Sequence, residues 1–268
     1  EQRDRLDAAL IAKIEEQSNN KQEVEQLILQ GANVNARNSD GDTVLSEAIY
    51  NGLPEIAKLL IEKGANPNEY TGSFQNTFPI FSALDKKDIH TLLALLQAGA
   101  NPNVTEYESE STPLDYLLGK YGMSKEFSIS GIKALVLYGG FPCQYASSFN
   151  RLAEGLFPEP LLQAIALKDI GRIKALLSSD YDQGITKDSN GISALVYAAG
   201  QGNEQILKLL LSSSYKYDTP GIEKGFEVVE NRLLGLEHDS LEYKQYKVVY
   251  KKLIQQHGDG IASTVLTA

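Results

Sequence analysis

Apolar residues recur along the chain in short segments with helical spacing, and the same polar pentapeptide follows each segment. The segments are VEQLILQ (24–30), IAKLLIEK (56–63) and LLALLQA (92–98), and each places its apolar residues on one side of a helix. Gly-Ala-Asn-x-Asn follows at 31–35, 64–68 and 99–103, in steps of 33 and 35 residues. A glycine after a helical segment can take positive φ and end the helix. The pattern therefore predicts an internal repeat in which a helix ends at each glycine.

A second marker recurs at the same step. Five tetrapeptides similar to Thr-Pro-Leu-x precede short apolar runs, and they begin at Thr43, Phe78, Thr112, Glu159 and Ser193. From Thr43 to Gly64, and from Phe78 to Gly99, the distance is 21 residues. Threonine suits the N-cap of a helix, and proline suits its first turn. Each repeat is therefore predicted to hold an inner helix after the tetrapeptide and an outer helix before the glycine.

These markers resemble the ankyrin repeat, which runs Asp-Gly-x-Thr-Pro-Leu-His-x-Ala-Ala, a glycine turn, an outer helix and Gly-Ala-Asp/Asn-x-Asn. Residues 40–43 and 189–193 match its opening turn, and residues 51–52 and 201–203 match the turn between its helices. The resemblance covers residues 5–218. It implies an all-α fold, an ankyrin-repeat solenoid of stacked helix-turn-helix units with short turn fingers and a helical C-terminal cap. No single repeat buries its apolar face alone, so stability is expected to come from the interfaces between neighbours.

The marker positions predict three parts of the chain. We expect residues 1–36 to form an N-terminal capping ankyrin repeat and residues 37–218 to form about five repeats with an irregular insertion around 119–158. Residues 219–268 are expected to form the helical C-terminal cap, which includes the basic amphipathic segment 241–256. That segment could instead lie on a membrane surface, but a solenoid needs a terminal cover at this place.

The repeats depart from the family pattern in two ways. The family tetrapeptide ends in His, and that position holds Ser46, Phe81, Asp115, Leu162 and Val196 here. The fourth repeat has extra residues at 119–130, which we expect to form a protruding loop. Residues 140–158 carry few repeat markers and are interpreted as a second irregular stretch.

Charge and composition narrow the choice of partner. Residues 1–150 carry 20 acidic and 12 basic side chains, whereas residues 151–268 carry 15 and 13. An acidic protein repels a phosphate backbone, so we expect no nucleic-acid partner. We expect instead a protein partner with a basic or mixed surface. The alternative is that the negative charge serves solubility alone. No apolar run reaches the roughly 20 residues that span a bilayer, so no membrane partner is expected. The single cysteine, Cys143, fits a reducing, cytoplasmic setting.

Catalytic chemistry is weakly indicated. The three histidines, His90, His238 and His257, are scattered, and no nucleophile signature surrounds Cys143, which we expect to be a buried or half-buried thiol. One cysteine and three scattered histidines give no metal-ligand spacing, and no phosphate-binding glycine motif occurs. We therefore predict that the chain is no enzyme and has no catalytic residue, metal, cofactor or small-molecule substrate. The alternative is the ankyrin targeting half of an enzyme, with its chemistry near 119–158 or outside this chain.

The turns and inner helices carry the predicted binding residues, because these elements line a concave face in the ankyrin family. Tyrosines beside charged residues suit a protein interface. The predicted protein-binding residues are Asp42, Glu47, Tyr50, Tyr70, Phe74, Glu106, Tyr107, Glu108, Glu110, Asp115 and Tyr116. The alternatives are that the acidic residues are solvated loop tips and that each tyrosine packs on its own finger.

The divergent repeats further resemble ankyrin proteins of intracellular bacteria, some of which are secreted into host cells as effectors. This resemblance implies a host protein as the partner and the host cytosol as the location. A third hypothesis, a structural spacer without a dedicated partner, predicts a featureless groove.

Overall fold

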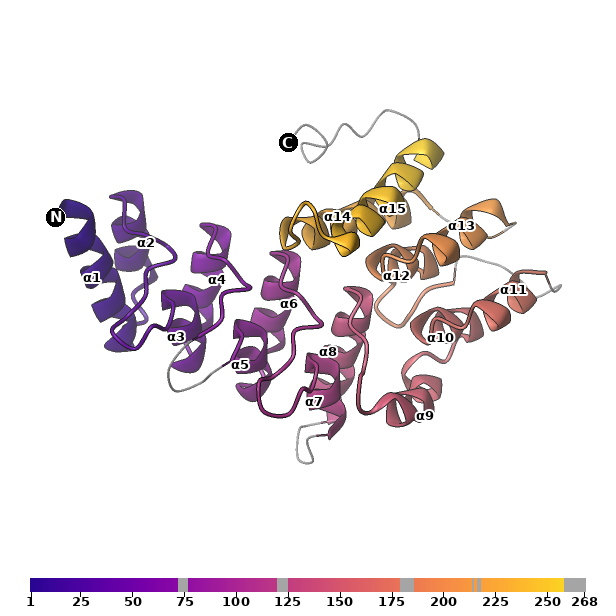
Figure 1. Cartoon of the computed structure of the whole chain (residues 1–268), viewed down its shortest axis with the longest axis horizontal. Coiled ribbons are helices and arrows are strands. Elements are labelled where there is room, and N and C mark those ends of the chain that lie inside the picture. Colours follow the sequence, from indigo (N-terminus) through magenta and orange to yellow (C-terminus); the bar gives the residue numbers. More distant parts are fainter. Residues whose placement is uncertain (72–76, 120–124, 179–185, 214, 216–217, 258–268) are drawn as a thin grey trace. The chain divides into compact units, whose positions relative to one another are not determined.

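The structure is a computed structural model that describes residues 1–71, 77–119, 125–178, 186–213, 215 and 218–257. Within these residues the regular elements are helices, and two isolated β-bridges join Arg37 to Thr43 and Lys187 to Ser193 (Figure 1). None of the described helices is long and apolar enough to cross a membrane. The chain divides into two compact units, unit 1 (Glu1–Gly131) and unit 2 (Ile132–Ala268). The predicted all-α fold is confirmed.

Unit 1 consists of helix pairs that stack in sequence order. Its helices are α1 (Gln2–Glu15), α2 (Lys21–Leu29), α3 (Val44–Tyr50), α4 (Pro54–Glu62), α5 (Pro79–Asp85), α6 (Ile89–Gln97) and α7 (Pro113–Gly119). The inner helices contact one another in the order α1, α3, α5 and α7, and the outer helices in the order α2, α4 and α6 (Figure 1). Each repeat therefore buries its apolar side against the next repeat.

The sequence markers have the local roles that their chemistry predicts. The Thr43 hydroxyl caps α3 by accepting the Ser46 N–H at 3.2 Å. Ala48 and Ala83 are fully buried on the inner helices, where a small side chain lets neighbouring helices approach closely. Gly64 and Gly99 both adopt φ +90° after their outer helices, a conformation that favours glycine.

A ladder of asparagines joins successive repeats, and the sequence interpretation did not foresee it. The Asn66 N–H donates to Asn35 Oδ1 at 2.8 Å, and the Asn101 N–H donates to Asn68 Oδ1 at 2.7 Å. Asn68 also donates its side-chain amide to the Gly99 carbonyl at 3.0 Å. The last asparagine of the first two Gly-Ala-Asn-x-Asn pentapeptides, Asn35 and Asn68, thus binds the backbone of the next copy, which gives asparagine a structural role at these two positions.

Unit 2 also stacks its helices in pairs. Its helices are α9 (Ala146–Leu156), α10 (Pro160–Ala166), α11 (Ile170–Ser178), α12 (Ala194–Gly200), α13 (Glu204–Ser212), α14 (Thr219–Leu234) and α15 (Leu241–His257). Inner helix α10 contacts α12, and α12 contacts α14; outer helix α11 contacts α13, and α13 contacts α15 (Figure 1). The last two helices therefore continue both rows, as the predicted C-terminal cap requires.

Buried polar contacts fix α15 in this cap. The Tyr246 hydroxyl donates to the Gly200 carbonyl at 2.6 Å. Arg232 on α14 is fully buried and forms an ion pair with Glu242 on α15. Because a buried charge is costly unless it is paired, this ion pair ties the two helices together.

The stretch without repeat markers is largely helical. Helix α8 (Lys125–Leu137) includes part of the predicted loop at 119–130, so the loop interpretation was wrong from residue 125 onward, and residues 120–124 lie outside the described residues. Helix α9 occupies much of 140–158 and buries Phe149, Ala153 and Leu156. These three residues have helical spacing, a signal that the search for markers passed over. The three-part division of the chain stays a prediction.

Candidate protein-binding face

Three consecutive inner helices of unit 1 carry a row of polar and aromatic side chains, which we call the inner-helix row (Tyr50, Asp85, Lys86 and Tyr116). The Lys86 ammonium lies 4.9 Å from the centroid of the Tyr50 ring. The Tyr116 hydroxyl donates to Asp85 Oδ1. Each contact joins one repeat to the next, so the row is held in place by the stacking of α3, α5 and α7.

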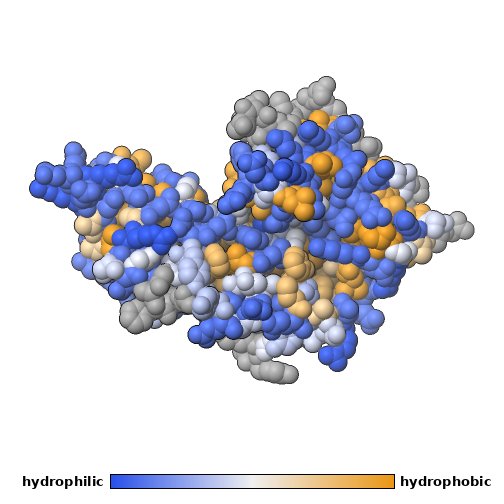
Figure 2. Space-filling view, in the orientation of Figure 1, coloured by the Kyte–Doolittle hydropathy of each residue, from blue (hydrophilic) through white to orange (hydrophobic). Residues whose placement is uncertain are grey.

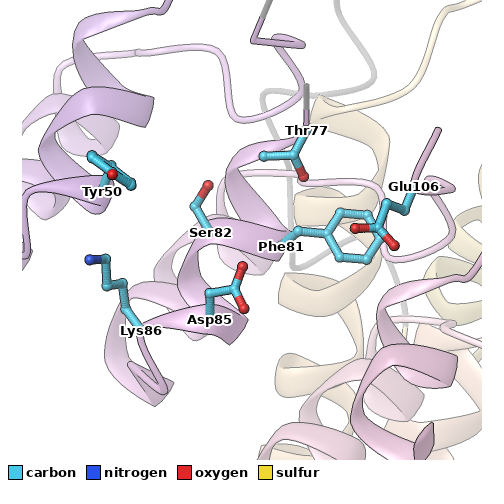
Figure 3. A pocket seen from close by; sticks show the side chains of 7 residues that line it. All are labelled: Tyr50, Thr77, Phe81, Ser82, Asp85, Lys86 and Glu106. Carbon is cyan, nitrogen blue, oxygen red and sulfur yellow. The ribbon is translucent and has the colours of Figure 1, made fainter. Parts of the chain in front are cut away.

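A pocket of about 330 Å³ opens beside this row (Figure 3). It is lined by Tyr50, Thr77, Phe81, Ser82, Asp85, Lys86 and Glu106. The exposed Tyr50 ring supplies aromatic surface, and the Phe81 ring, which is only 2% exposed, forms part of the floor. The Asp85 and Glu106 carboxylates supply negative charge, and Lys86 extends toward the Tyr50 ring. A tyrosine ring attracts a cation to its face, so the pocket has the chemistry to hold a basic side chain.

The sequence interpretation missed Asp85 and Lys86. Asp85 lies seven residues after Phe78, as Tyr50 lies seven residues after Thr43. Aligning the inner helices by the first residue of the tetrapeptide would therefore have placed Asp85 in the row with Tyr50.

The turn before α7 presents Tyr107 and Glu108 to solvent. The Glu106 N–H donates to the Ser111 carbonyl at 3.0 Å, and the Ser109 hydroxyl donates to the Glu106 carboxylate at 2.6 Å. These bonds hold the turn closed, and Glu110 adopts φ +53° within it. Tyr107 is 75% exposed at the tip. The acidic residues 106, 108 and 110 therefore differ in role, because Glu106 also stabilises the turn.

Tyr50 and Tyr107 stand out on a largely polar surface. Tyr50 is 51% exposed. The face drawn in Figure 2 is mostly hydrophilic, with hydrophobic residues interspersed. Large exposed aromatic rings on such a surface are the side chains that most often anchor protein interfaces.

In the turn between α4 and α5, Tyr70 and Glu69 are engaged in contacts with other residues of unit 1. The Tyr70 ring packs edge-to-face on Phe78 with centroids 5.1 Å apart, and Tyr70 is half-buried. The guanidinium of Arg37 pairs with the neighbouring Glu69. Tyr70 is thus packed on its own finger, the alternative considered for each tyrosine. Phe74 lies outside the described residues.

Two predicted binding residues are buried, so the expectation that they face a partner was wrong. Asp115 has an exposed fraction of 0% and Asp42 of 5%. Asp115 Oδ2 accepts the Thr112 N–H at 3.1 Å, and the Asp115 N–H donates to the Thr112 hydroxyl at 3.2 Å. This reciprocal arrangement caps α7 as a capping box does.

Glu47 is half-buried on α3 next to the inner-helix row. Burial raises the pKa of its carboxyl group, while a hydrogen bond from the Asn51 amide at 2.9 Å opposes the rise. Nearby Asp42 raises the pKa further. Glu47 is therefore held by its own helix and offers only part of its carboxylate to a partner.

The groups considered for catalysis lie in different settings. Cys143 is exposed, which corrects the expectation of a buried or half-buried thiol. His90 is exposed on α6, and the His238 ring stacks on Tyr243 with centroids 4.7 Å apart. In the part of the chain that the structure describes, no cluster of three or more His, Cys, Asp or Glu residues could hold a metal ion.

Comparisons with known proteins agree with the stacked helix pairs. A family model described as ankyrin repeats (3 copies) matches residues 10–106. An ankyrin repeat protein of Acanthamoeba polyphaga mimivirus is 38% identical over 81 residues, which are 30% of this chain and 10% of that protein. The mitochondrial disaggregase of Homo sapiens is 26% identical over 237 residues, 88% of this chain and 30% of that protein. The bovine (Bos taurus) mitochondrial disaggregase is 30% identical over 144 residues, 41% of this chain and 21% of that protein.

The chain thus spans less than a third of the length of these relatives. Together with the repeat markers, the stacked helix pairs and the asparagine ladder, the family match over residues 10–106 shows that unit 1 contains ankyrin repeats.

Proposed function

We propose that the chain is a protein-binding module whose unit 1 holds a partner protein. The contact surface consists of the inner-helix row, the adjoining pocket and the tip of the 106–111 turn. Ankyrin repeats serve as protein-protein interaction modules, and the pocket beside exposed Tyr50 is the observation that supports this particular surface. Glu47, Glu108 and Glu110 border it, whereas Asp42, Tyr70 and Asp115 contribute through the structure of the repeats.

The partner carries a basic side chain that enters the pocket. Two carboxylates and two aromatic rings line this pocket, against one ammonium group. An arginine or lysine of the partner would contact Asp85 and the face of the Tyr50 ring, displacing Lys86 from that face. Charged and aromatic groups at the centre of an interface carry much of the binding energy. A structural spacer would have no use for such a pocket, so we favour binding.

Affinity capture with paired variants tests the proposal. The tagged full-length chain is compared with Tyr50→Ala/Tyr107→Ala and with the exposed control Tyr145→Ala in unit 2, which is 39% exposed. We expect the double variant to lose captured proteins that the wild type and the control retain. Equal recovery by all three would refute this surface, and circular dichroism checks that each variant is folded.

A second function is favoured by one comparison. The human disaggregase match extends over 88% of this chain yet covers 30% of that protein. The chain could therefore be the ankyrin half of a longer protein with its enzymatic chemistry elsewhere, and unit 1 would then bind the substrate protein. Mass spectrometry of the native gene product tests this, since a much larger mass with an added enzymatic domain would support it.

The effector role with a host protein as its partner, and the cytoplasmic location, stay predictions. The same capture experiment separates them, because an effector recovers partners from a host lysate and a resident protein recovers them from its own cell.

A further inference from the structure

Unit 2 contains a second pocket, of about 680 Å³, on the turn between α12 and α13. The turn lies between the α10–α11 turn, which supplies Lys168, and helix α15. The pocket is lined by Lys168, Gln201, Gly202, Asn203, Glu204, Gln205, Lys208, Lys244, Gln245 and Val248. Lysines and side-chain amides thus make up most of its wall, in a protein whose net charge is −10.

The positive charge of this pocket is largely uncompensated. Glu204 pairs with Lys252 at 3.3 Å, which neutralises the one carboxylate of the lining. Among the described residues, no carboxylate forms an ion pair with Lys208 or Lys244. The Lys168 ammonium lies 5.3 Å from the Phe141 ring, and desolvation lowers its pKa although Glu242 opposes this. The wall of the pocket thus carries three ammonium groups, while its one carboxylate is paired with Lys252 and Glu242 acts on Lys168.

The side-chain amides that line this pocket can form hydrogen bonds with a peptide backbone. Glutamine and asparagine side chains each offer both donors and an acceptor, as peptide groups do. Gln201 is only 8% exposed, and its Oε1 has no hydrogen-bond donor. An unsatisfied buried acceptor calls for an explanation, and an N–H group entering the pocket would supply the missing donor. A phosphate ion has no such N–H group, and the lining contains no arginine to form a bidentate contact.

We propose that this pocket, the lysine-amide pocket, binds an acidic peptide segment of a protein partner. The ammonium groups of Lys168, Lys208 and Lys244 pair with the carboxylates of that segment. The amides of Gln201, Gln205 and Gln245 hydrogen-bond its backbone. This site lies wholly in unit 2 and is independent of the unit 1 surface proposed above.

Fluorescence anisotropy with the full-length chain tests the proposal. The probe is a fluorescein-labelled hexaglutamate peptide, and a hexaglutamine peptide is the uncharged control. The variant Lys208→Glu/Lys244→Glu reverses the charge of two lysines that line the pocket. The control Lys174→Glu/Lys251→Glu makes the same change in net charge at two exposed lysines of unit 2 that do not line it. Gln201→Leu removes the buried acceptor without changing the charge.

We expect the pocket reversal to weaken hexaglutamate binding about tenfold, because two exposed ion pairs are lost and reversal turns attraction into repulsion. Gln201→Leu weakens it less, and the matched reversal leaves it within about twofold. Excess inorganic phosphate does not displace the peptide at constant ionic strength, and Tyr50→Ala/Tyr107→Ala has no effect. Absence of hexaglutamate binding, equal weakening by both reversals, or displacement by phosphate would overturn the proposal.

Discussion

Removing one rung of the asparagine ladder tests whether unit 1 holds together through bonds between repeats. In Asn68→Ala, the Asn101 N–H loses its acceptor at 2.7 Å and the Gly99 carbonyl loses its donor at 3.0 Å. A net hydrogen bond contributes about 1 kcal/mol, and a part-buried donor left unpaired costs about 1–3 kcal/mol. The free energy of unfolding of unit 1 should therefore fall by about 2–3 kcal/mol.

Urea unfolding followed by circular dichroism measures this loss, and hydrogen exchange of the Asn101 amide locates it. Asn190→Ala is the matched control, because Asn190 is exposed at the tip of a turn in unit 2 and surface substitutions usually stay within about 0.5 kcal/mol. The reasoning is refuted if the two variants have the same urea midpoint, or if exchange at Asn101 is unchanged in Asn68→Ala.

Three further predictions concern backbone, packing and pH. Lys87 adopts φ +55°, a left-handed conformation that is costly for a residue with a Cβ. Lys87→Gly should therefore raise the free energy of unfolding by up to about 1 kcal/mol, measured by urea unfolding. Gly200→Ala would place a Cβ 1.8 Å from the Leu137 carbonyl oxygen, so this variant should lose about 3 kcal/mol of the free energy of unfolding. A Cβ at Gly155 meets nothing within 4 Å, so the control Gly155→Ala should gain about 0.5–1 kcal/mol. Thermal unfolding measures both changes. Burial raises the pKa of Tyr138 to about 12, above the value near 10 of an unfolded tyrosine. The fold therefore favours the neutral form of Tyr138. The stability that this form contributes is complete below pH about 10 and is lost between about 10 and 12. In pH-dependent unfolding, Tyr138→Phe should therefore lose less stability over this alkaline range than the wild type.

The repeat architecture could be predicted from the sequence because its markers depend on local chemistry. A glycine such as Gly64 favours positive φ, and a threonine such as Thr43 favours the N-cap of a helix, through interactions within a few residues of the chain. The same local rules missed α9, because its signal is the spacing of Phe149, Ala153 and Leu156 rather than a repeat marker.

The candidate site was harder to predict because it depends on contacts between repeats. Sequence alone identified Tyr50 and Tyr107, which the structure places on the surface. It could not show that Asp115 turns inward to cap α7, since an aspartate after Pro-Leu is equally compatible with an exposed position. Nor could it show that Lys86 reaches the Tyr50 ring of the preceding repeat.

Site-specific photo-crosslinking tests most directly whether the unit 1 surface is where a partner binds. A photoreactive phenylalanine analogue replaces Tyr107 in one chain and Tyr145, an exposed position in unit 2, in another. Irradiation in a cell lysate should then join a partner protein to the chain labelled at position 107, with no such product from position 145. The same product from both positions, or from position 145 alone, would contradict the proposed binding surface.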